Sequence, residues 1–118
     1  RPNEDYETQY KRLCSTLDPA SSLERTFIDF LYERSLRLPD AAQKSFPNLY
    51  CQPDFYYESN AWIFIDGSPH DKPEVRERDT EMRQRMRAMG HDVLVYYYRD
   101  DMKAFIDSRP DIFRKVRT

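Results

Sequence analysis

Apolar side chains recur at helical spacing in two stretches of the chain, which are therefore predicted to be helices. The first stretch covers residues 18–38 and is followed by Pro39, which cannot continue a helix. Its apolar face consists of Leu23, Phe27, Leu31 and Leu38. The second stretch begins at Pro73 and ends at Gly90, residue types that suit the first turn and the C-terminal cap of a helix. Its apolar face consists of Val75, Met82, Met86 and Met89.

Elsewhere the apolar residues form short runs, which are typical of strands. Residues 53–57 and 61–65 flank the turn-like residues 58–60, so we interpret them as a β-hairpin. A third strand is expected at 93–98 and a short helix at 102–106. The order α-β-β-α-β-α predicts an α/β (α+β) fold, in which helices flank a mixed sheet of three to four strands with the hairpin at its centre.

The length of 118 residues fits one domain. We expect residues 19–118 to form its core and residues 1–18 to be an N-terminal extension or linker. Because the chain starts with Arg1 rather than methionine, we interpret it as a piece of a larger protein. No apolar run approaches the roughly 20 residues that a membrane helix needs, and no secretory signal segment is present. Cys14 and Cys51 have no CxxC partner, which argues against a zinc or disulfide framework and favours a reducing, cytoplasmic location.

Basic residues are concentrated in the C-terminal part of the chain. The formal net charge is -2, but residues 72–118 hold 12 basic and 9 acidic side chains, whereas residues 1–71 hold 7 and 12. Arg76, Arg83 and Arg87 recur on one side of the second predicted helix. Arginine can bind phosphates in a forked geometry, although a helix rich in Arg and Glu is more often simply solvated.

Asp54 and Asp66 lie on the two strands of the predicted hairpin, near the same end. Antiparallel pairing would bring their carboxylates together, and such carboxylates repel each other unless a cation lies between them or one is protonated. Oxygen ligands of this kind suit Mg²⁺ or Mn²⁺. Alternatively, Asp54 pairs with an arginine and Asp66 fixes the turn before Gly67. His70 follows closely, as either a proton acceptor for this site or an exposed loop histidine.

The pieces that carry this chemistry occur in a characteristic order. They are Ser22-Leu23-Glu24, Pro53-Asp54-Phe55, Ile65-Asp66-Gly67-x-x-His70, Arg78-Asp79, Gly90 and Val93-Leu94-Val95. This order resembles the PD-(D/E)xK nuclease superfamily, and within it the very-short-patch-repair endonucleases, over roughly residues 21–99. The resemblance implies a restriction-endonuclease-like core and hydrolysis of DNA phosphodiester bonds that depends on Mg²⁺ or Mn²⁺.

The resemblance also implies roles for individual residues. Asp54 would be the primary metal ligand, Glu24 a ligand through water, and Asp66 a group beside the metal. His70 would orient or deprotonate the attacking water, whose pKa the cation lowers. The residues along the DNA phosphates would be Lys72, Arg76, Arg83 and Arg87.

Two positions differ from the superfamily pattern. The second acid, two residues before Asp66, is replaced by Phe64. The very-short-patch-repair enzymes accept an apolar residue there and use the next backbone carbonyl, which is that of Ile65. Asp66 occupies the position of the strand lysine, which leaves His70 or Lys72 as substitutes. The zinc ligands of the repair enzymes are absent from this sequence, so mismatch recognition does not carry over.

The chain also resembles segments at the C-terminal ends of large bacterial superfamily 2 helicases, some of which are linked to DNA repair or phage defence. The expected partners are therefore DNA and the helicase remainder of the same polypeptide. The sequence favours a metal-dependent endonuclease domain. A nuclease fold that has lost catalysis, and that binds DNA or packs against its parent protein, stays open because of Phe64 and because Tyr96, Tyr97 and Tyr98 could stack on bases. The overall acidity also permits an interaction domain without a nucleic-acid role.

Overall fold

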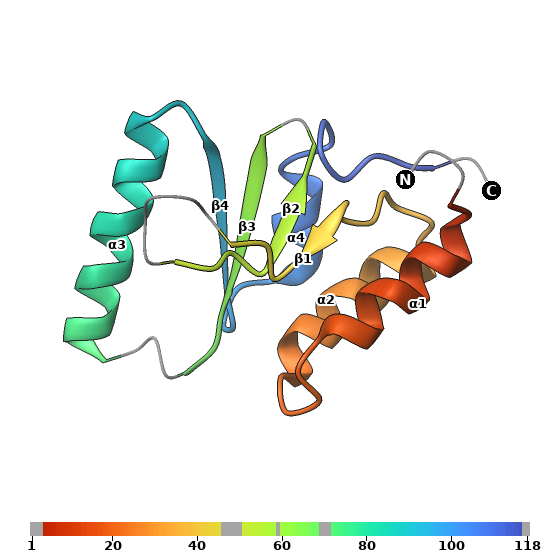
Figure 1. Ribbon diagram of the computed structural model, residues 1–118, viewed down its shortest axis with the longest axis horizontal. Helices are drawn as coiled ribbons and strands as arrows, with labels where there is room; N and C mark the ends of the chain where they lie inside the picture. The colour runs from red at the N-terminus through yellow and green to blue at the C-terminus, as the bar shows by residue number, and fades with distance from the viewer. Residues whose placement is uncertain (1–3, 46–50, 59, 69–71, 117–118) are drawn as a thin grey trace.

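The computed structural model describes residues 4–45, 51–58, 60–68 and 72–116, and these residues form four helices and a four-stranded sheet. The helices are α1 Tyr6–Thr16, α2 Ser22–Glu33, α3 Pro73–Ala88 and α4 Met102–Asp107. The strands are β1 Ala41–Ala42, β2 Phe55–Tyr57, β3 Ala61–Asp66 and β4 Asp92–Tyr97. Figure 1 shows α3 on one side of the sheet and α1 and α2 side by side on the other. None of the helices formed by the described residues is long and apolar enough to cross a membrane.

The sheet has the order β1-β2-β3-β4, so the hairpin of β2 and β3 lies at its centre. β2 and β3 pair antiparallel, with Phe55 opposite Ile63, whereas β3 and β4 are parallel. A parallel pair needs a crossover connection, and α3 provides it. All six residues of β3 are buried, because this strand has a neighbour at each edge and helices on both faces. The predicted mixed sheet flanked by helices is therefore confirmed.

Side chains on the two faces of β3 pack into two separate hydrophobic clusters. Alternation along the strand sends Ile63 and Ile65 into the larger cluster, to which α1, α2 and α4 contribute. Phe27 of α2 is fully buried there, and its ring stacks on Phe55 with the centroids 5.4 Å apart. The smaller cluster consists of Trp62, Phe64, Met86 and Val93. Because Met86 is the only apolar side chain that α3 buries, the attachment of this helix depends strongly on polar contacts.

Helix α1 is part of the core, whereas residues 1–18 were expected to be an extension or linker. Asp5 caps the helix, because its Oδ1 accepts a 2.7 Å hydrogen bond from a backbone N–H in the first turn. Leu13 is fully buried in the larger cluster. The hydroxyl of Tyr6 donates a 2.6 Å hydrogen bond to the carbonyl of Leu36, in the segment that follows α2. The N-terminal helix therefore belongs to the folded domain.

Removing the Tyr6 hydroxyl should test this attachment of α1. The Tyr6→Phe variant keeps the ring but loses the hydrogen bond to Leu36, so its free energy of unfolding should fall by about 1 kcal/mol. Urea unfolding measures the difference. Tyr32→Phe is the matched control, because the Tyr32 ring stacks on Tyr10 but its hydroxyl has no hydrogen-bond partner among the described residues. Equal stability of the Tyr6 variant and the wild-type protein would contradict the contact.

Candidate active site

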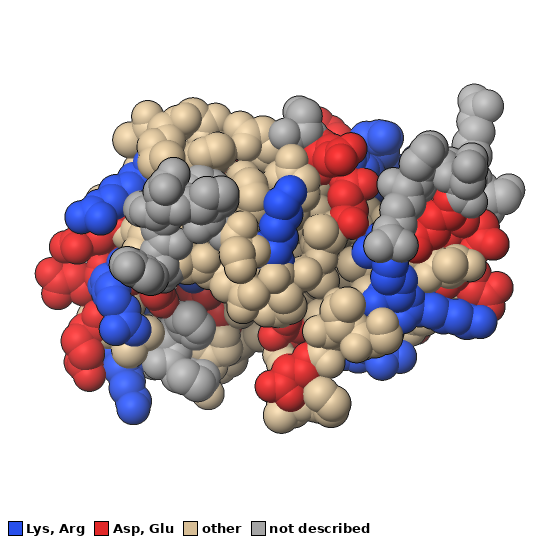
Figure 2. Space-filling view, viewed as in Figure 1, with Lys and Arg blue, Asp and Glu red and all other residues tan. Residues whose placement is uncertain are grey.

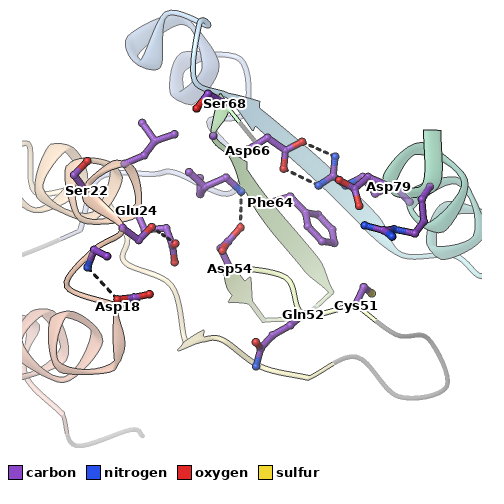
Figure 3. Close-up of a pocket in the computed structure, with 17 residues that line it drawn as sticks. Asp18, Ser22, Glu24, Cys51, Gln52, Asp54, Phe64, Asp66, Ser68 and Asp79 are labelled. Atoms are coloured by element: carbon purple, nitrogen blue, oxygen red, sulfur yellow. Dashed lines mark hydrogen bonds and ion pairs between the residues drawn. The ribbon is translucent and has the colours of Figure 1, made fainter. Parts of the chain in front are cut away.

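A cleft of about 840 Å³ opens at the end of the sheet where β2 begins and β3 ends. Figure 3 shows the start of α2 on one side of this cleft and α3 on the other. The approach to β2 and the end of β3 lie between them. Three acids that the sequence singled out, Glu24, Asp54 and Asp66, all line the cleft. The fold therefore brings these residues to one place, although their side chains are arranged differently from expectation.

Asp54 is half-buried between the two helices, one residue before β2. Its Oδ2 accepts a 2.6 Å hydrogen bond from the backbone N–H of Ile65. The side chain of Asp54 therefore satisfies a backbone donor of β3 at a point where β2 has not yet begun. Burial raises the pKa of Asp54 from 3.8 to about 7; the hydrogen bond from Ile65 opposes the rise and the nearby Glu24 adds to it. Near neutral pH, a cation at this carboxyl would therefore compete with a proton.

Glu24 lies in the first turn of α2, and among the carboxyls its charge does most to raise the pKa of Asp54. Its Oε1 accepts a 2.7 Å hydrogen bond from the side-chain amide of Gln43, and its Oε2 accepts one from the hydroxyl of Ser21. Two carboxyls from different elements thus converge, which is costly unless they share a proton or a cation.

Asp66 is turned away from this pair and toward α3. Its two oxygens each accept a 2.7 Å hydrogen bond from the guanidinium of Arg83, and both residues are buried. Strand alternation explains the direction, because Asp66 shares its face of β3 with Phe64. The centroid of the Phe64 ring lies 4.3 Å from the guanidinium carbon of Arg83. The expected pairing of Asp54 with Asp66 is therefore not observed, because Asp66 pairs with Arg83. The charges of Glu24 and, less strongly, Asp66 still raise the pKa of Asp54.

The arginines of α3 do not form one exposed row. Arg83 is buried against Asp66, and its Nε has no hydrogen-bond partner among the described residues, so it is not placed to meet phosphates as expected. Arg76 and Arg87 are exposed and line a hollow of about 250 Å³ between α3 and β4, and Lys72 is exposed at the start of α3. Figure 2 shows acidic and basic side chains intermixed over α3, so this face is not a continuous basic surface.

The three tyrosines at the end of β4 and just after it mainly pack against neighbouring side chains. Tyr96 is buried in the larger cluster, and its ring contacts Phe105 edge-on with centroids 5.3 Å apart. Tyr97 and Tyr98 are half-buried, and the Arg76 guanidinium lies over the Tyr97 ring, 5.1 Å from its centroid. These contacts favour strand packing over base stacking for Tyr96.

The backbone of Ile65 supplies a further oxygen toward Asp54. In an extended strand the N–H and the carbonyl of one residue point to the same edge. Because the N–H of Ile65 donates to Asp54, the carbonyl of Ile65 faces the same edge of β3, next to the residues that precede β2. The expected base, His70, lies outside the described residues.

The oxygens gathered here suit a hard divalent cation. Within the described ranges, no group of three or more His, Cys, Asp or Glu side chains is arranged as a metal site. Mg²⁺ is usually held by one or two carboxylates, while waters and substrate phosphates complete its coordination. Asp54, Glu24 and the Ile65 carbonyl match that donor set, because they combine two carboxyls with one neutral oxygen at an open cleft.

Two glutamines that sequence reasoning missed support this site. Gln43 follows β1 and binds Glu24, as described above. Gln52 lines the cleft, and its side-chain amide donates a 2.7 Å hydrogen bond to the carbonyl of Gln43. Both lie in polar segments without periodicity, so no local pattern distinguished them from solvated loop residues.

Comparison with known proteins adds no family to this description. No family model, curated protein or solved structure matches the chain.

Proposed function

We propose that this chain is a metal-dependent nuclease domain of the PD-(D/E)xK type that hydrolyses phosphodiester bonds in DNA. The observation that carries the proposal is the convergence of Asp54 and Glu24 in one open cleft. A protein rarely holds two carboxyls together without a use for them, because the arrangement opposes folding at neutral pH. A bound Mg²⁺ or Mn²⁺ would offset that cost and explain the arrangement.

The residues named in this proposal have distinct roles. Asp54 and the Ile65 carbonyl would hold the cation directly, and Glu24 would hold it through water. When bound, the cation would supply a positive charge that polarises a phosphoryl oxygen and lowers the pKa of a water molecule. His70 accepts the proton of the attacking water, and Lys72 contacts a neighbouring phosphate. Asp66, held by Arg83, forms the wall beside α3 rather than a metal ligand.

The order of the elements supports the proposed restriction-endonuclease-like core. The helix that carries Glu24 comes first, the hairpin that begins at Asp54 follows, and α3 then crosses to a strand parallel to β3. This is the order in which the motifs of the superfamily occur. We further propose that the domain works in the bacterial cytoplasm as part of a helicase used in DNA repair or phage defence, with DNA and the helicase remainder as partners.

Metal binding tests the proposal without knowledge of the DNA substrate. Calorimetric titration of Mn²⁺ should show saturable binding to the wild-type chain and none to Asp54→Ala, because the variant lacks the primary ligand. Mn²⁺-dependent nicking of plasmid should be lost in the same variant. Asp107→Ala is the matched control, since Asp107 is an exposed carboxylate on α4 that pairs with Lys103. Unchanged Mn²⁺ binding in Asp54→Ala would show that the proposed site is wrong.

A nuclease fold without catalysis is the second candidate, and two observations favour it. Phe64 fills the position of the second acid, and the carboxylate of Asp66 is occupied by a buried arginine. This candidate predicts binding of DNA, or docking on the parent protein, without cleavage at any Mn²⁺ concentration.

DNA binding by the start of α3 can be measured under either candidate. Lys72→Ala should lower the slope of log affinity against log salt by about one unit, because one phosphate contact is lost. Fluorescence anisotropy with a labelled duplex gives the slope. Lys103→Ala on α4 should leave it unchanged. An unchanged slope in Lys72→Ala would place the phosphate contacts elsewhere.

A further inference from the structure

Gln43 has a backbone conformation that is unfavourable for a residue with a side chain. Its φ of 56° lies in the left-handed region. Among the described residues, the other non-glycine case is Ser35, with φ of 55°, which follows the end of α2, where a left-handed residue commonly closes a helix. Gln43 instead follows β1 and closes no helix. Such conformations persist where surrounding contacts enforce them, and they cluster at functional sites.

The contacts of Gln43 join the two elements that carry the converging carboxyls. Its backbone N–H donates a 3.0 Å hydrogen bond to the carbonyl of Asp54. Its side-chain amide donates a 2.7 Å hydrogen bond to Oε1 of Glu24 in α2. Its carbonyl accepts a 2.7 Å hydrogen bond from Gln52, which itself lines the cleft. A single residue outside the cleft therefore connects α2, the approach to β2 and the cleft wall.

An amide is well suited to hold a carboxylate next to a cation. Together with Ser21, Gln43 gives each oxygen of Glu24 a donor, so rotation of the carboxylate away from Asp54 would break both hydrogen bonds. Both donors are neutral, so they fix the geometry without cancelling the negative charge that attracts a metal. A lysine or arginine in place of Gln43 would instead compete with the cation for Glu24.

We propose that Gln43 is a positioning residue of the candidate metal centre, which holds Glu24 toward Asp54 through its side-chain amide while its left-handed backbone anchors it to the Asp54 segment. This inference rests on the proposed function, because it gives Gln43 a role in the same site. Gln43 touches neither the cation nor the substrate. It acts through Glu24, as residues behind metal ligands generally do.

Replacing Gln43 with glycine separates positioning from structure. Glycine adopts positive φ without strain, and this gain offsets the lost hydrogen bond to Glu24, so the melting temperature of Gln43→Gly should stay close to that of the wild-type chain. Its dissociation constant for Mn²⁺, measured by calorimetry, should rise about 10-fold or more, because Glu24 keeps the donor from Ser21 but loses the one from Gln43. Gln43→Asn should also bind Mn²⁺ more weakly, since its shorter side chain cannot reach Glu24. Ser35→Gly is the matched control for backbone strain, and it should leave Mn²⁺ binding unchanged.

The same titrations distinguish failure of this inference from failure of the proposed function. Wild-type affinity in Gln43→Gly, together with loss of binding in Asp54→Ala, would overturn the role of Gln43 alone. A lower melting temperature in Gln43→Gly with unchanged Mn²⁺ affinity would also overturn it and leave Gln43 a purely structural residue. Equal binding in Asp54→Ala and the wild-type chain, or no saturable binding to the wild-type chain at millimolar Mn²⁺, would overturn both proposals.

Discussion

The Asp54→Asn variant should be more stable than the wild-type protein at pH 8 without divalent metal, and equally stable near pH 4. Burial and the neighbouring Glu24 raise the pKa of Asp54 from 3.8 to about 7. A group with a higher pKa in the folded protein contributes stability below its unfolded pKa and loses that contribution as the pH rises through the folded value. A shift of this size corresponds to at most about 4 kcal/mol. Asparagine removes the charge but keeps an oxygen for the N–H of Ile65.

Urea unfolding from pH 4 to pH 8 in the presence of a chelator measures this effect. Other carboxyls titrate in the same range, so the informative quantity is the difference between wild type and variant at each pH. Asp107→Asn, which removes an exposed carboxylate on α4, is the matched control. Addition of Mn²⁺ at pH 8 should stabilise the wild-type protein and not Asp54→Asn. The difference in free energy of unfolding between the two proteins should therefore become smaller. A difference that is constant across the pH range would contradict the raised pKa.

Local signals in the sequence predicted most of the elements but not all of them. Pro73 and Gly90 bracket α3 as expected, and Gly90 has the positive φ of 93° that this position requires. The first predicted helix, over residues 18–38, corresponds to α2, which starts later and ends earlier, at Ser22–Glu33. α1 was missed because its apolar face is built largely from tyrosines in a polar segment, although Asp5 provided a capping signal. β1 has two residues and no pattern that sequence reasoning could detect.

The candidate site was predictable in its members but not in its pairing. Glu24, Asp54 and Asp66 all reach the cleft, because helix and strand boundaries place them at one end of the sheet. The partner of each carboxyl depends on the direction of its side chain at the end of a twisted strand. The spacing of two aspartates in the sequence does not determine that direction. Arg83 looked like Arg87 in the sequence, since both recur on one helix. Arg83 is buried because Asp66 lies opposite it on β3, whereas Arg87 is exposed.

Replacement of Arg83 by methionine should lower the free energy of unfolding by about 3–5 kcal/mol, because a buried carboxylate is left without its guanidinium partner. Both side chains are buried, and two hydrogen bonds of 2.7 Å join them. Methionine keeps an apolar stem against the ring of Phe64, so the loss reports the charge rather than the packing. Equilibrium unfolding in urea at pH 7 measures the change.

A double-mutant cycle separates the pair itself from the cost of leaving one partner alone. Asp66→Leu combined with Arg83→Met should recover most of the lost stability, because no charge then remains buried. Lys103→Met, which removes the exposed ion pair with Asp107 on α4, should cause no measurable change. If Arg83→Met were as stable as the wild-type protein, the buried pair could not be what fixes α3. Since Met86 is the only apolar side chain that α3 buries, that result would assign the attachment of α3 to Met86 and to polar contacts such as the 3.0 Å hydrogen bond from Arg87 to the carbonyl of Val93.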